Sequence, residues 1–110
     1  MYVIMGLRLT YSAVAILNAL AQGRRYGFDI IDFTGLPSAT VYPTLGKLED
    51  AGFVSSTWEA HATAVKSKRP PRRNYELRAA GRRALNEGLE RFRLLRDIAP
   101  TAAPDKAGGR

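Results

Sequence analysis

The spacing of apolar residues changes from a helical period to a strand period at Gly52, and this change constrains the fold more than any other feature of the sequence. Before Gly52, apolar side chains recur three and four residues apart in three short segments. After it, β-branched and aromatic residues gather in residues 53–59, and apolar and polar residues alternate in 72–78. The sequence therefore predicts three helices followed by a two-stranded hairpin.

The three helices are predicted over residues 10–22, 27–33 and 38–51. Thr10 and Ser38 are of the residue types that cap a helix N-terminus, so each is expected to begin its helix. The buried stripe of the third helix consists of Val41, Leu45 and Leu48. Three short helices with a glycine-containing turn between the second and the third predict a helix-turn-helix.

Positive charge is concentrated in the loop between the two predicted strands. The chain has 17 Lys and Arg against 10 Asp and Glu, yet four basic and four acidic residues cancel within residues 1–58. The densest group, here called the wing cations, consists of Lys66, Lys68, Arg69, Arg72 and Arg73. Such a cluster is typical of a polyanion site, because each cation that neutralises a phosphate releases a counterion. A solvated loop explains the charge equally well.

A basic loop at the tip of a hairpin that follows a helix-turn-helix predicts a winged helix, whose basic part covers residues 60–73. A last helix is predicted over 79–99, with an apolar stripe made of Leu85, Leu89, Phe92 and Leu95. Because the hairpin already closes the domain, this stripe is expected to bind a second copy of the chain. The predicted organisation is a DNA-binding domain over 1–78, a dimerisation helix over 79–99 and a disordered tail over 100–110.

Several function classes are excluded by composition. The chain has no cysteine and one histidine, His61, and it shows neither paired carboxylates nor a nucleophile triad, so we expect no enzyme, metal or cofactor. Its longest apolar runs are far below the roughly 18–20 residues that span a membrane, and no signal peptide is expected. Trp58 is expected to lie in the core rather than in a ligand site.

Five segments carry a resemblance to a known family. They are Tyr26–Ile30, Ser38–Leu45 with its Tyr-Pro pair, Leu48–Val54, Arg69–Leu77 and Gly81–Leu85. Together they resemble the PadR family of bacterial transcriptional regulators, over about residues 12–92. The resemblance implies a winged-helix dimer that binds operator DNA, usually as a repressor, through a C-terminal dimerisation helix. With no membrane span or signal peptide expected, the expected location is the cytoplasm, at the bacterial nucleoid.

This chain departs from the family at three positions. It has Tyr26, Phe28 and Arg78 where the family often has His, Tyr and Thr. The missing Thr removes a cap worth about 1 kcal/mol from the start of the last helix. The chain is similar to the compact members, which have a single helix after the wing.

The third helix and the wing supply the predicted DNA contacts. With its stripe turned inward, the helix leaves Ser38, Ala39, Thr40, Tyr42, Pro43 and Lys47 for the major groove. The wing cations are expected to follow the phosphate backbone or enter the minor groove. The helix contains no Arg, Asn or Gln, so each half-site should discriminate bases modestly. The alternative is that Ser38 only caps the helix and Tyr42 only packs.

These features predict a sequence-specific DNA-binding regulator, and in particular a dimeric repressor at a palindromic operator. Two alternatives stay open: an architectural or replication-associated winged-helix protein, and a protein-interaction module without promoter control. The expected partners are double-stranded DNA and a second copy of the chain, with no membrane. The sequence does not identify an effector, whether small molecule or protein.

Overall fold

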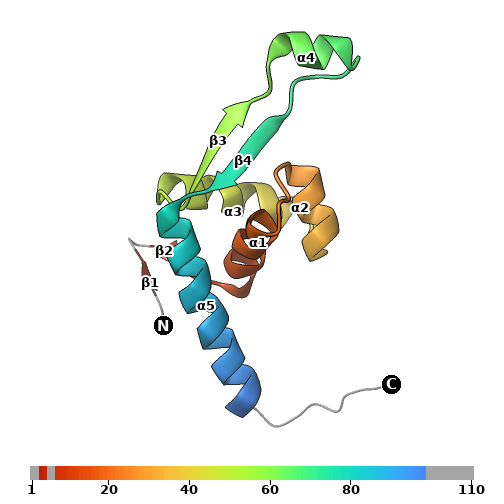
Figure 1. Ribbon diagram of the computed structural model, residues 1–110. Helices are drawn as coiled ribbons and strands as arrows, with labels where there is room; N and C mark the ends of the chain where they lie inside the picture. Colours follow the sequence, from red (N-terminus) through yellow and green to blue (C-terminus); the bar gives the residue numbers. More distant parts are fainter. Residues whose placement is uncertain (1–2, 5–6, 99–110) are drawn as a thin grey trace, which may run out of the picture.

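The computed structural model describes residues 3–4 and 7–98, with side chains over 9–93, and its architecture is mainly α with a β-hairpin, as predicted (Figure 1). Its elements in chain order are β1 Val3–Ile4, β2 Leu7–Arg8, α1 Tyr11–Ala21, α2 Gly27–Thr34, α3 Ser38–Asp50, β3 Val54–Trp58, α4 His61–Lys66, β4 Arg73–Leu77 and α5 Ala79–Ile98. The predicted tail over 100–110 lies outside the described residues. None of the described helices is long and apolar enough to cross a membrane.

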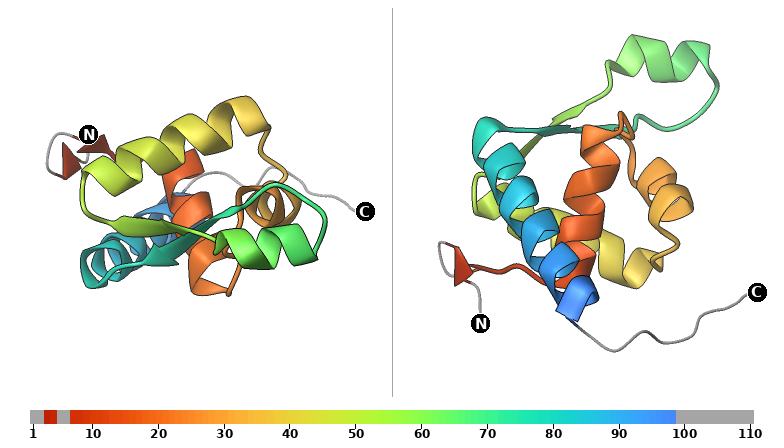
Figure 2. Two further views of the ribbon diagram at one scale, coloured as in Figure 1. Left: turned by 90° about the horizontal axis from the view of Figure 1, so that it is seen from above. Right: turned by 60° about the horizontal axis from the view of Figure 1, so that its bottom comes forward.

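Helix α1 is the centre of the fold, with α5 on one side and α2 on the other (Figure 2). It begins as predicted, because the Thr10 hydroxyl accepts a hydrogen bond from the Ala13 N–H at 3.1 Å. Its buried side chains meet those of α2, α3 and β3 in one core. The largest fully buried side chains are Phe53, Ile16, Leu17, Ile30, Leu45, Leu48, Val41 and Val54.

The start of α3 differs from the prediction by one residue. Pro37 occupies the N-cap, and its carbonyl accepts hydrogen bonds from the N–H groups of Thr40 and Val41 at 2.9 and 3.0 Å. Ser38 is therefore the first residue inside the helix, and the prediction that Ser38 caps it is wrong. Pro37 begins the helix because its backbone is extended, at φ −70° and ψ 155°, and its carbonyl accepts the first helical bonds.

The wing consists of β3, β4 and the segment that joins them, and it projects away from the helices (Figure 1). Its strands pair antiparallel, from Val54 opposite Leu77 to Trp58 opposite Arg73. The base of the wing is fixed to the helix-turn-helix, because the Tyr75 N–H donates to the Arg25 carbonyl at 2.8 Å. The wing thus keeps a defined position beside α3.

The structure adds two elements that the sequence prediction lacks. The first is the antiparallel pair β1–β2, whose two-residue strands are too short to show a period. The second is α4, which lies at the far end of the wing where a plain loop was expected. Ala60, before α4, makes no side-chain capping bond, so the usual sequence signal for a helix start is missing.

Helix α5 packs along α1 within the same chain, so the expectation that its stripe has no intrachain partner is wrong for its first half. Ala84 and Leu85 belong to the hydrophobic core. Gly88 permits this contact, because a Cβ there would lie 2.6 Å from Val14 Cγ2. Gly81 lets the start of α5 approach the backbone before β3, since a Cβ there would collide with the Phe53 carbonyl. The later turns of α5 extend beyond the other helices (Figure 1).

Candidate nucleic-acid interface

Helix α3 separates its two faces as the sequence predicts. Val41, Leu45 and Leu48 are fully buried. The predicted groove-facing residues lie on the outside: Ser38, Ala39, Tyr42, Pro43 and Lys47 are exposed, and Thr40 is half-buried. The helix runs without interruption past its internal proline. Five of the six predicted helix contacts are thus exposed to solvent, and the sixth is half-buried.

Tyr42 both packs and remains accessible. Its side chain lies against the first residue of α2, so that a Cβ at Gly27 would come within 2.6 Å of the ring carbon Cζ. Tyr42 is nevertheless 48% exposed. The structure therefore shows that Tyr42 packs, with its hydroxyl group where α2 and α3 meet, and its contact with DNA stays a prediction.

The wing cations fall into three groups that the sequence does not distinguish. Lys66 and Lys68 are exposed and form no ion pair within the described part of the chain. Arg69 and Arg72 are directed into the wing, where they meet the carboxylate of Glu59. Arg73 instead points toward α3. Of the five wing cations, three thus lie beside carboxylates and only the two lysines have no ion-pair partner among the described residues.

Arg73 connects the wing to the end of α3. Its guanidinium group lies 3.2 Å from Glu49 Oε1, and its Nε donates to Ser56 Oγ at 2.8 Å. Ser56 in turn donates its hydroxyl hydrogen to Glu49 at 2.7 Å. This three-residue network fixes β3 and β4 against the last turn of α3.

The prediction that Trp58 lies in the core is wrong, since its side chain is 65% exposed. In the strand register Trp58 stands opposite Arg73, two residues beyond Ser56, on the part of the hairpin that extends past the core. The Arg73 guanidinium lies 5.6 Å from the Trp58 ring, at cation–π distance. A strand pattern alone does not reveal where the hairpin leaves the core.

The residues predicted at the dimer interface have different environments. Leu85 is 3% exposed and packs within its own chain, so it is not available to a partner. Leu89 is 45% exposed, and Phe92 is half-buried edge-on against Tyr11, with ring centroids 5.8 Å apart. Leu95 lies in α5, but its side chain is outside the described part of the structure.

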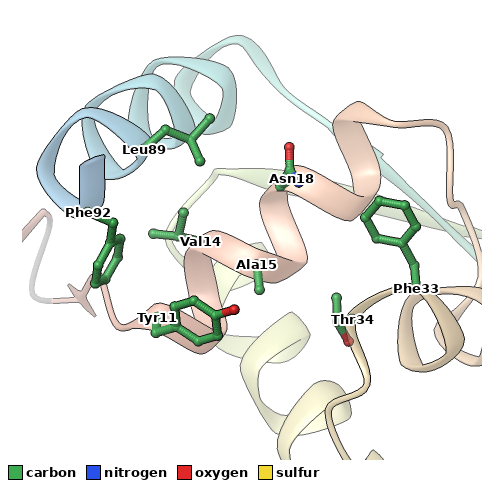
Figure 3. A pocket seen from close by; sticks show the side chains of 8 residues that line it. All are labelled: Tyr11, Val14, Ala15, Asn18, Phe33, Thr34, Leu89 and Phe92. Carbon is green, nitrogen blue, oxygen red and sulfur yellow. The ribbon is translucent and has the colours of Figure 1, made fainter. Parts of the chain in front are cut away.

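Leu89 and Phe92 border an open cavity of about 240 Å³ between α1, α5 and the end of α2 (Figure 3). The lining residues are Tyr11, Val14, Ala15, Asn18, Phe33, Thr34, Leu89 and Phe92. Three of them, Tyr11, Phe33 and Leu89, are large apolar side chains that remain exposed in the single chain. This apolar surface lies on the helices, whereas the wing cations lie on the hairpin.

Comparisons with known proteins agree with this geometry. The sequence model of the Transcriptional regulator PadR-like family matches residues 16–87. The fold is similar to a PadR family transcription regulator from hypervirulent Clostridium difficile R20291, with a TM-score of 0.69 and 19% identity, covering 81% of this chain and 94% of that one. It is also similar to a PadR-like transcription factor from Bacteroides fragilis, with a TM-score of 0.64 and 24% identity over 77% and 82% of the two chains.

A third similar structure is that of Bordetella bronchiseptica BpsR, whose DNA binding is regulated by 6-hydroxynicotinic acid. Its TM-score is 0.66 at 17% identity, with 86% of this chain and 62% of that chain covered. No curated protein matches the chain in sequence. The matched family and the first two structures are transcription regulators, not enzymes.

Proposed function

Because the chain belongs to the Transcriptional regulator PadR-like family, we propose that it is a sequence-specific repressor that binds a palindromic operator as a homodimer. The observation that carries this proposal is the exposed face of α3 beside a wing with free lysines. A helix of this kind reads base edges in the major groove while a flanking wing contacts the backbone. Residues 1–78 would bind DNA, and the helix over 79–99 would form the dimer.

On α3, the first turn faces the bases in this proposal. Ser38 and Thr40 offer hydroxyl groups, and the Ala39 methyl group suits a thymine methyl. Lys47, two turns later, suits a phosphate. Without a bidentate Arg, Asn or Gln on the helix, sequence preference also draws on the spacing of the two half-sites and on DNA shape.

The dimer contact in this proposal uses the apolar surface around the cavity. Its support is the exposure of Tyr11, Phe33 and Leu89, since large apolar side chains grouped on a surface are typical of interaction sites. A two-fold axis through α5 would bring two copies of α3 to successive half-sites, as helix-turn-helix dimers require. Leu85 takes no part, because it is already buried.

The dimer is tested by sedimentation velocity. Leu89→Asp should give a monomer, because it places a charge at the centre of the apolar surface. The matched control is Val65→Asp, which alters a similarly exposed apolar residue on α4, away from the cavity, and should leave a dimer. A dimer that survives Leu89→Asp would exclude this surface as the contact.

DNA binding is tested by selecting duplexes from a random pool with the wild-type protein, then titrating the selected duplex by fluorescence anisotropy with excess scrambled competitor. We expect binding that survives the competitor and saturates at two chains per duplex. Failure to enrich any sequence would contradict the proposal and favour an architectural role. Saturation at one chain would contradict the dimeric operator complex alone.

A further inference from the structure

Glu59 is the acidic residue that directly precedes the basic part of the wing, residues 60–73. Its side chain is only 11% exposed. Both carboxylate oxygens accept hydrogen bonds from Arg69, and the bond from Nη2 to Oε2 is 2.7 Å long. The backbone N–H of Arg72 donates to Oε1 at 3.3 Å, and the Glu59 N–H donates to the Arg72 carbonyl at 2.7 Å. These bonds lower the pKa of Glu59 to about 2, with Arg69 the largest cause, so the carboxylate is charged at neutral pH.

Arg72 is engaged on its other side by aromatic rings of the helix-turn-helix. Its guanidinium carbon lies 4.2 Å from the ring centroid of Tyr26 and 5.3 Å from that of Phe28. These two rings stack on each other with an interplanar angle of 4°. Arg72 therefore joins Glu59 to the start of α2, with its guanidinium group against the Tyr26 ring on one side and 3.8 Å from the Glu59 carboxylate on the other.

The segment that Glu59 and Arg69 enclose contains α4 and the two free lysines. Helix α4 has six residues and no side-chain cap, so it is too short to be stable by itself. Its support comes from the buried Ala64, whose carbonyl accepts a hydrogen bond from the Arg69 N–H at 3.1 Å. Because the Glu59–Arg69 pair closes the segment 60–68, it fixes the positions of Lys66 and Lys68.

We propose that Glu59 is a positioning residue for DNA binding: it holds Arg69 and Arg72 inside the wing and thereby presents Lys66 and Lys68 to the phosphate backbone. The inference rests on the proposed function, and it reverses a simple expectation. By charge alone, removing an acidic residue from a basic wing should strengthen DNA binding. If Glu59 positions the wing, its removal weakens binding to the selected duplex.

The first measurement needs no DNA. Glu59→Gln keeps the size of the side chain and removes its charge, and we expect the α4 amides to exchange hydrogen several-fold faster while the α1 amides keep their wild-type rates. Arg69→Gln should have the same local effect, because it removes the other half of the pair. Unchanged exchange in α4 in both variants would overturn the inference, whatever the protein binds.

The second measurement compares the selected duplex with a scrambled duplex of the same composition. Glu59→Gln should bind the selected duplex about tenfold more weakly and the scrambled duplex no more weakly than the wild type does. The charge control is Glu87→Gln, which raises the net charge equally on the exposed surface of α5 and should change both affinities less than twofold. Equal or tighter binding of Glu59→Gln to the selected duplex would overturn the inference.

The salt dependence of Arg69→Gln separates positioning from direct contact. In a protein that already carries Lys66→Ala and Lys68→Ala, a positioning role predicts that Arg69→Gln leaves the slope of log K against log salt concentration unchanged, because no lysine contact remains to be lost, whereas a lost phosphate contact of Arg69 itself lowers that slope by about 1. A lowered slope would place Arg69 on the DNA and overturn the inference. Should the wild-type protein enrich no duplex, the proposed function fails instead, and the exchange rates of α4 still decide whether Glu59 organises the wing.

Discussion

Two glycines inside helices provide a direct test of how α5 packs. Gly46 lies on the exposed face of α3, and a Cβ there would meet nothing within 4 Å. Gly88 is buried in α5, and a Cβ there would lie 2.6 Å from Val14 Cγ2 and 3.4 Å from Val14 Cγ1. Both positions gain the same helix propensity on substitution by alanine, so the difference between the two variants isolates the contact of α5 with α1.

The magnitudes follow from these surroundings. Gly46→Ala should stabilise the protein by about 0.5–1 kcal/mol, because alanine loses less backbone entropy in a helix. Gly88→Ala gains the same amount but forces α1 and α5 apart, and overpacking of this kind costs about 1–3 kcal/mol. The free energy of unfolding of Gly88→Ala should therefore lie about 1–3 kcal/mol below that of Gly46→Ala.

The assay is urea denaturation at one fixed protein concentration, with the slope m compared among the wild type and the two variants. An unchanged m would show that the unfolding reaction is the same in all three proteins. On heating, the two variants should differ by at least about 4 °C in Tm. Equal stabilisation by both substitutions would refute the packing of α5 on α1 described here. It would also refute the conclusion that Leu85 is buried within its own chain and takes no part in the dimer contact.

Three further predictions concern the wing. The double variant Lys66→Ala and Lys68→Ala should lower the slope of log K against log salt by about 2 per chain, measured by anisotropy on the selected duplex. The pKa of Glu59 is depressed from 4.5 to about 2, so its contribution to wing order should be complete above pH 4.5 and lost as the pH falls toward 2; α4 amide shifts in NMR should follow this course in the wild type and not in Glu59→Gln. Trp58 is the single tryptophan and is exposed, so acrylamide should quench its fluorescence efficiently, and saturation with the selected duplex should protect it.

The helix-turn-helix was predictable because its signals are local. The stripe of Val41, Leu45 and Leu48 repeats at a helical period, and the same residues are fully buried in the structure. The stripe of α5 repeats equally well, yet Leu85 lies in the core and is 3% exposed, whereas Leu89 borders the open cavity and is 45% exposed. Periodicity identifies the apolar face of a helix, but it does not specify which element covers each turn.

The wing was harder to predict, because its structure depends on contacts between residues far apart in the sequence. Glu59 binds Arg69 across a segment that includes the uncapped helix α4. Arg72 contacts Tyr26, which lies far from it in the sequence. Trp58 shows the same difficulty, since its strand leaves the core only two residues before it. A linear count of charges and aromatic residues records none of these distances.

The wing also shows why a count of cations overstates the expected number of phosphate contacts. Five neutralised phosphates would contribute a salt slope of about 4.5 per chain, at about 0.9 each. Three of the five wing cations already lie beside the carboxylates of Glu59 and Glu49. A phosphate that displaced one of these carboxylates would exchange one anion for another and leave the released carboxylate facing the DNA, so the exchange is disfavoured. Lys66 and Lys68 alone would contribute a slope of about 1.8 per chain. The measured contribution of the wing to the salt slope therefore decides whether all five wing cations contact phosphates or only these two lysines.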